Sequence, residues 1–332
     1  MICSELFDTP LNDGKIFVCG DTHGRNIDTS KLNGRNFPEQ KELTKDDVVI
    51  QLGDFGWVWY PFGKNKEQEY WIDWLAGKNY TLAVVLGNHE NYDIIDALPV
   101  EVKWENEVKV LKREQGSIYF LKRGAVYIIN GKKILAIGGA ESTDKASRVA
   151  HESWWEQEKL SKDEMDTCLE EISKHNNVFD YVLTHTCPAK YATRFSNNIS
   201  KARCSVANFL EYVSNMIEFK EWHFGHFHRD KEILDAKYRC HYNASPFELG
   251  EDTTNVKVVN SEIIDATYFD LDVYELYGCG KCVRMEDIKK LPFYALWSES
   301  AMGSTMGVSE KYGSMVYLHD WVNFARSYIA HG

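Results

Sequence analysis

Seven side chains of types that bind divalent metals occur in five short segments, which read GDTHGR, GD, GNHE, TH and GHFH in chain order. Carboxylate oxygens, imidazole nitrogens and amide oxygens suit metals such as Mn, Fe and Zn. Residues i and i+2 of an extended chain point the same way, so the Asp-x-His and His-x-His pairs each direct two groups toward one point. The candidate ligands are Asp21, His23, Asp54, Asn88, His185, His226 and His228.

Seven ligands are too many for one tetrahedral zinc ion. They suit two metal ions about 3.5–4 Å apart that share a bridging carboxylate. Such a pair lowers the pKa of a bridging water and holds the oxygens of an in-line displacement. We therefore expect two divalent or trivalent ions, and the ligand types leave Mn, Fe and Zn open.

Each segment follows a short apolar run rich in β-forming residues, which predicts a buried strand, and a similar run precedes Gly138. Amphipathic patterns between the runs predict helices. This alternation indicates an α/β fold, in which side chains at the carboxyl ends of strands collect together. The predicted strands are 16–18, 48–52, 82–86, 134–137, 181–183 and 222–224, and the predicted helices are 67–75, 154–160, 162–174 and 208–219.

The composition is that of a globular protein: 332 residues, with 44% hydrophobic and 27% charged. The 38 Lys and Arg against 50 Asp and Glu give a formal charge of -12, which disfavours general nucleic-acid binding but leaves a local basic groove open. The sequence has no apolar run of about 18 residues and no leader pattern at its start. We expect a cytoplasmic protein without a membrane segment, and its eight cysteines as free thiols.

The pattern of strand, glycine and polar residue stops near residue 275. We expect one domain over residues 1–272, which ends with a strand at 263–271. A small α/β appendage over 273–332 would end in a helix near 319–329. The sequence assigns no function to this appendage, although it could support a homo-oligomer.

The five segments resemble the motifs of the calcineurin-like metallophosphoesterase superfamily, which are GDxHG, GD, GNH with Asp or Glu, a lone His, and GHxH. The order is the same, and the resemblance covers about residues 15 to 245. It implies two facing mixed β-sheets flanked by helices. It also implies a phosphoric ester hydrolase with two metal ions.

The resemblance also implies a role for each matching position. The first metal would take Asp21, His23, Asp54 and His228, and the second would take Asp54, Asn88, His185 and His226. Asp54 would bridge the ions, and a bridging hydroxide would attack phosphorus in line. His89 would protonate the leaving oxygen as general acid. Glu90 would orient its neighbours, and Arg25 would bind a phosphate oxygen.

We expect the substrate to be a phosphomonoester or a small phosphodiester. A nuclease acting on nucleic acid is an alternative, although the negative charge disfavours it. Protein Ser/Thr phosphatase activity is another alternative. Phosphatases of that kind extend the second motif to GDxVDRG, whereas Trp57 and Val58 stand here in place of the motif's second Asp and its Arg.

Two further stretches contain candidate substrate-binding residues. Lys145 and Arg148 lie between the third and fourth motifs and could reach a phosphate or a leaving group, or could belong to a solvated helix start. Residues 55–74 follow Asp54 and hold eight aromatic residues, including Trp57. They could stack on a nucleobase, form the core of a lid or make a dimer contact.

Overall fold

The computed structural model describes residues 14–195, 204–233 and 237–250, together with four short strands beyond residue 273. The chain divides into two compact units, Met1–Gly250 and Glu251–Gly332. The predicted domain boundary at 272/273, the strand at 263–271 and the helix at 319–329 lie outside the described residues. The described strands of the second unit form an antiparallel sheet in the order β14 (Tyr274–Leu276), β15 (Gly280–Arg284), β17 (Gly313–Tyr317) and β16 (Gly307–Ser309).

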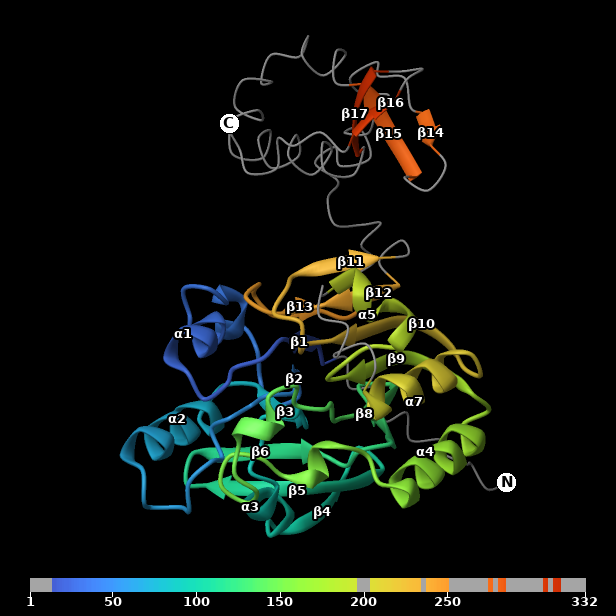
Figure 1. The fold of residues 1–332 in the computed structure, drawn as a ribbon. Helices are drawn as coiled ribbons and strands as arrows, with labels where there is room; N and C mark the ends of the chain where they lie inside the picture. The colour runs from blue at the N-terminus through green and yellow to red at the C-terminus, as the bar shows by residue number, and fades with distance from the viewer. Residues whose placement is uncertain are drawn as a thin grey trace, which may run out of the picture. The chain divides into compact units, whose positions relative to one another are not determined.

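The first unit contains two mixed β-sheets, as predicted (Figure 1). The first sheet has parallel pairing from β1 through β2 and β3 to β6, with antiparallel strands at both edges. Its order is β13 (Phe247–Glu248), β1 (Ile16–Cys19), β2 (Val48–Leu52), β3 (Thr81–Val85), β6 (Gly116–Leu121), β5 (Asn106–Arg113) and β4 (Val100–Lys103).

The second sheet pairs β8, β9, β10 and β12 in parallel, and its two edge strands are antiparallel. Its order is β11 (Lys231–Ile233), β12 (Tyr238–Cys240), β10 (Glu218–Phe224), β9 (Val178–Thr184), β8 (Lys132–Ile137) and β7 (Ala125–Ile129). The six strands that were predicted before residue 250 are therefore confirmed, with ends shifted by a few residues.

Alternating side chains of each central strand enter two different cores, because successive residues of a strand face opposite sides of the sheet. In β1, Ile16 and Val18 pack with residues of the second sheet, whereas Phe17 and Cys19 pack toward the helices. The second sheet has its own helix-facing core, which includes Val182 and Trp222. The sheets therefore face each other, and helices cover their outer faces.

The helices that cover the first sheet include α2, and those that cover the second include α4 and α7 (Figure 1). None of the described helices is long and apolar enough to cross a membrane. The α-helices are α1 (Asn26–Thr29), α2 (Lys66–Ala76), α3 (Tyr92–Asp96), α4 (Lys162–Lys174), α5 (Ala189–Phe195) and α7 (Ser205–Ser214). The short 3-10 helices are η1 (Ser30–Leu32), η2 (Pro38–Lys41), η3 (Lys145–Ser147) and η4 (Glu156–Glu158).

One helix prediction is wrong, and another is right only for part of its range. The predicted helix at 154–160 is a β-bridge at Trp154 followed by the single turn η4, because Trp155 and Lys159 on either side of that turn are extended. The predicted helix at 208–219 begins earlier and stops at Ser214, and its last residues belong to β10. In both stretches, packing of aromatic residues overrides the helical spacing: Trp155 is buried, and Phe219 packs against Trp222.

The Tyr127 hydroxyl joins the two sheets. Tyr127 lies on β7 of the second sheet, and its hydroxyl donates to the carbonyl of Glu107 on β5 of the first sheet at 2.7 Å. The same oxygen accepts from the backbone N–H of Lys122, just after β6, also at 2.7 Å. Removing this oxygen would leave a carbonyl and an N–H without their partner.

We expect Tyr127→Phe to lower the free energy of unfolding by about 1–3 kcal/mol, the typical cost of leaving buried polar groups unsatisfied. Urea denaturation followed by circular dichroism would measure this. Tyr212→Phe is the control, because Tyr212 is exposed on α7 and its change should stay within about 0.5 kcal/mol. Equal stabilities of the two variants would contradict the role given to Tyr127.

Candidate metal centre

The structure brings all seven candidate ligands together where the two sheets meet. The residues follow the carboxyl ends of five parallel strands, β1, β2 and β3 of the first sheet and β9 and β10 of the second. Their atoms form two groups, and within each group the possible ligand atoms lie within 4.8 Å of one another. The first group is Asp21, His23, Asp54 and His228, and the second is Asp54, His185 and His226.

Asn88 adjoins the second group. Its side-chain oxygen, Oδ1, lies 3.2 Å from Nε2 of His185. The side-chain nitrogen of Asn88 points instead to the hydroxyl of Ser142 at 3.1 Å. The amide is therefore placed so that its oxygen, the atom able to bind a metal, faces the second group.

Asp54 belongs to both groups and divides its two oxygens between them. Oδ1 lies 3.2 Å from Nε2 of His185 in the second group, and Oδ2 lies 3.5 Å from Nε2 of His23 in the first. Burial opposes ionisation of this carboxyl, but the positive charge of His185 and His89 and hydrogen bonds from His185 and His23 hold its pKa well below the usual value. Asp54 is thus a charged group able to bridge two cations.

The donor set fits metal ions, because each group contains a histidine whose far nitrogen is already engaged. Nδ1 of His185 bonds the carbonyl oxygen of Leu52 at 2.7 Å, and Nδ1 of His23 lies 3.2 Å from a carboxylate oxygen of Asp28. Both rings therefore direct Nε2 into the cluster. Metal-binding histidines are oriented in this way by carbonyl or carboxylate partners.

Glycine and strained backbone allow the loops to approach this closely. A Cβ at Gly225 would overlap Oδ1 of Asp21, and a Cβ at Gly87 would overlap Asp54. His23, Asp54, His226 and His228 have positive φ values of 50°, 53°, 67° and 52°. Such conformations cost about 1–3 kcal/mol each and collect at functional sites.

Lys31, Asp28 and Tyr242 support the first group, and sequence analysis missed them. The buried ammonium of Lys31 donates to the carbonyl of Asp21 at 2.6 Å and to that of Tyr242. The Tyr242 ring stacks on His228 at a centroid distance of 4.7 Å. Asp28 lies close to the GDTHGR motif, but no local signal marks Lys31 or Tyr242, because their contacts depend on packing between distant segments.

The Glu90 carboxylate ties the second and third motifs together. It accepts from the backbone N–H groups of Phe55 at 2.8 Å, Gly87 at 3.2 Å and Gly56 at 3.3 Å. Burial, together with the charge of Asp54, raises the pKa of Glu90 to about 7. Glu90 therefore orients the loops that carry Asp54 and Asn88, as the motif had led us to expect.

A cavity of about 150 Å³ opens beside the two groups. Its remaining walls come from His89 and the segment 141–144, which brings the carboxylates of Glu141 and Asp144 to the site. His89 is half-buried, and its backbone N–H donates to Oδ1 of Asp54 at 2.7 Å. Burial lowers the pKa of the His89 ring, and the positive charge of Arg148 adds to this effect.

The predicted substrate-binding residues lie in different surroundings. Arg25 is exposed at the start of α1, just after the first motif, and Lys145 is exposed on η3. Arg148 forms a two-point ion pair with Asp144, with both distances 2.8 Å. Trp57 does not line the cavity: it is only 3% exposed, its indole nitrogen donates to Thr29 at 2.9 Å, and its ring stacks on Trp71. It is a core residue, because the chain after Asp54 turns inward beneath α2.

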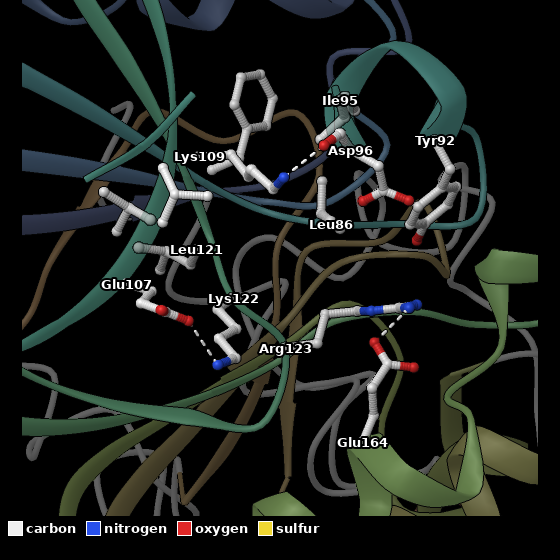
Figure 2. Close-up of a pocket in the computed structure, with 13 residues that line it drawn as sticks. Leu86, Tyr92, Ile95, Asp96, Glu107, Lys109, Leu121, Lys122, Arg123 and Glu164 are labelled. Carbon is white, nitrogen blue, oxygen red and sulfur yellow. Dashed lines mark hydrogen bonds and ion pairs between the residues drawn. The ribbon is translucent and has the colours of Figure 1, made fainter. Parts of the chain in front are cut away.

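A second and larger cavity, of about 320 Å³, lies between α3, β5, β6 and α4 (Figure 2). Its floor is apolar, and the ion pairs Lys122–Glu107 and Arg123–Glu164, at 2.7 and 2.6 Å, lie at its side. The Tyr92 ring lines it, while the Tyr92 hydroxyl donates to the carbonyl of Gly87 at 2.6 Å. This cavity therefore lies behind the GNHE loop, and none of the seven ligands lines it.

Comparisons with known proteins agree with the geometry. The family model of calcineurin-like phosphoesterases matches residues 14–230, and the chain belongs to this family. The family is metal-dependent, and membership indicates a hydrolase. No curated protein matches the chain.

Among solved structures, the chain is similar to the phosphopantetheinyl hydrolase of Mycobacterium tuberculosis. The identity is 14%, the match covers 74% of this chain and 99% of that chain, and the TM-score is 0.37.

We expect Gly225→Ala to weaken metal binding about tenfold or more, because the added Cβ must displace the Asp21 carboxylate from the first group. Titration of metal-free protein with Mn²⁺ would measure this. Gly34→Ala is the matched control, since a Cβ there would meet no atom within 4 Å. Equal affinities of the two variants would contradict the close approach of Gly225 to Asp21.

A buried histidine pair outside the ligand groups predicts a pH effect on stability. Nδ1 of His223 lies 3.0 Å from Nε2 of His241, and Nε2 of His223 lies 3.2 Å from Glu221. Burial lowers the pKa of both rings, and Glu221 partly opposes this for His223. The positive charges of Arg239 and Lys31 lower the pKa of His241 further. Below the ordinary histidine pKa of about 6.5, the unfolded chain therefore binds protons that the folded chain does not.

Because of the His223–His241 pair, we expect the free energy of unfolding of the metal-free protein to decrease as the pH falls below about 6.5. His241→Gln should reduce this slope relative to wild type, whereas His175→Gln, at the end of α4, should not. Urea denaturation at several pH values between about 5 and 8 would measure it. An unchanged slope in His241→Gln would contradict a lowered pKa of His241 in the folded protein.

Proposed function

We propose that the protein is a dinuclear metal-dependent phosphoesterase that hydrolyses a phosphomonoester or a small phosphodiester. The observation that carries this proposal is the division of the Asp54 oxygens between two ligand groups that converge beside His89. Two ions of Mn, Fe or Zn held there would activate a water and neutralise charge on the phosphoryl oxygens.

The side chains around the cavity suit the remaining tasks of ester hydrolysis. His89 lines the cavity, and its link to Asp54 fixes its backbone beside both groups. This position supports a role for the His89 ring as the general acid that protonates the leaving oxygen, which contributes typically ~10²–10⁴-fold to such reactions. Arg25 is exposed two residues after His23, and we propose that its guanidinium binds a phosphate oxygen.

The walls of the cavity favour a small substrate over a nucleic acid. Glu141 and Asp144 place carboxylates beside the ligand groups. Arg148 neutralises Asp144, and Glu141 is held by the N–H and hydroxyl of Ser205, at 2.6 Å each. One phosphoryl group fits a cavity of about 150 Å³, whereas a long polyanion would extend well beyond it. A nuclease or a protein Ser/Thr phosphatase therefore has less support.

The test uses metal-stripped protein, with Mn, Fe, Zn, Ni or Mg added back singly. We expect turnover of p-nitrophenyl phosphate or bis-p-nitrophenyl phosphate, with two metal ions per chain by elemental analysis. Asp54→Asn should lose metal and activity together. His89→Asn should keep both metals and lose about 10²–10⁴-fold in turnover.

Three results would count against the proposal. A wild-type chain that binds no metal would remove its basis. Full turnover in His89→Asn would show that another group supplies the proton. Preferential cleavage of single-stranded DNA over both small esters would favour the nuclease.

A further inference from the structure

A chain of hydrogen bonds leads from the metal centre to a buried carboxylate that the mechanism above does not use. The Asn88 amide nitrogen donates to the Ser142 hydroxyl at 3.1 Å. That hydroxyl donates to Oε2 of Glu158 at 2.6 Å, and the Ser142 backbone N–H donates to Oε1 of Glu158 at 2.9 Å. Asn88, Ser142 and Glu158 are only 5%, 6% and 0% exposed.

We propose that Glu158, acting through Ser142, is a positioning residue that makes Asn88 present its oxygen to the second metal. The proposal rests on the proposed function, because it requires Asn88 to be a ligand of that metal. It concerns the second group alone, since none of these contacts reaches Asp21, His23 or His228.

The donor-to-acceptor direction of these hydrogen bonds follows from the chemistry of Asn88, Ser142 and Glu158. Both carboxylate oxygens of Glu158 accept from Ser142, one from its N–H and the other from its hydroxyl, so the single proton of the Ser142 hydroxyl goes to Glu158. The hydroxyl oxygen can then only accept from Asn88. Of the two ends of the Asn88 amide, only the NH₂ group can donate, and Oδ1 must therefore face the opposite way, toward His185.

The position of Glu158 explains how its side chain is held beside Ser142. Glu158 ends the single turn η4, and its carbonyl accepts from the backbone N–H of Ala140 at 3.1 Å. Together with the two bonds from Ser142, this fixes η4 to segment 140–142. The neighbouring Trp155 indole donates to Asp93 of α3 at 2.8 Å, so the same turn is also anchored just after the GNHE motif.

If Glu158 only stabilises the fold, its loss should have different effects from the loss of a residue that orients Asn88. Loss of a purely structural residue would disturb the whole metal centre or the stability of the protein, without preference for one metal. Loss of the orienting bond frees the Asn88 amide to rotate and weakens the second metal alone. Removal of such indirect partners of a metal typically costs about 10–100-fold in affinity.

Two variants separate these cases. Ser142→Ala removes the hydroxyl from the chain. Glu158→Gln keeps the shape of the side chain but adds a hydrogen-bond donor. If its Oε1 accepts from the Ser142 N–H, its NH₂ group faces the Ser142 hydroxyl. That hydroxyl then donates to Asn88 and favours the inverted Asn88 amide, with Oδ1 turned toward Ser142. Thr143→Ala is the matched control, because Thr143 lines the same cavity but is exposed.

The experiment titrates metal-stripped full-length protein with Mn²⁺ and measures both dissociation constants by calorimetry and by the electron paramagnetic resonance of free Mn²⁺. We expect wild type and Thr143→Ala to bind two ions equally well. Ser142→Ala and Glu158→Gln should keep the first dissociation constant and raise the second about 10–100-fold.

Two outcomes would overturn the inference while the proposed function stands. In the first, both variants bind two ions as tightly as wild type does. In the second, both dissociation constants rise together, which is the result expected if Glu158 has a purely structural role. A wild-type chain that binds one Mn²⁺ or none would overturn the proposed two-metal function, and this inference with it.

Discussion

The arrangement of the site depends on the buried carboxylate of Asp54. A lone carboxylate in such a place would be strongly destabilised, since burial disfavours its charged form. Here imidazoles on both sides and the backbone N–H of His89 compensate the charge. The same carboxylate requires the β1, β3 and β9 loops to approach the loop after β2 within a few ångströms. The glycines and positive φ values around it are consequences of that requirement.

The residues around the site form two supporting sets, one for each ligand group. Lys31, Asp28 and Tyr242 hold the first group from the side of β1 and β12. Glu90 and Ser142 hold the loop that carries Asn88. Each set uses backbone amides or carbonyls as well as side chains, so the ligands are fixed by the main chain of their neighbours.

Much of the fold and the ligand groups could be predicted from the sequence because the signals are local. Each motif places a ligand directly after a short apolar strand, and Gly53, Gly87 and Gly225 allow the close approach. The remaining features depend on contacts between distant segments. Trp57 follows a ligand in sequence, yet its ring belongs to the core, and Glu158 reaches Ser142 only because η4 forms where a longer helix was predicted.

Each ligand group draws its members from both sheets. Asp21, Asp54 and Asn88 follow strands of the first sheet, whereas His185, His226 and His228 follow strands of the second. In each group, the ligands from the second sheet are therefore synthesised nearly a hundred residues or more after those from the first sheet. A chain emerging from the ribosome has no complete donor set until β10 and the loop after it, which contains His226 and His228, are made. Metal capture would then mark the completion of folding, and the bound ions would act as cross-links that hold the two sheets closed.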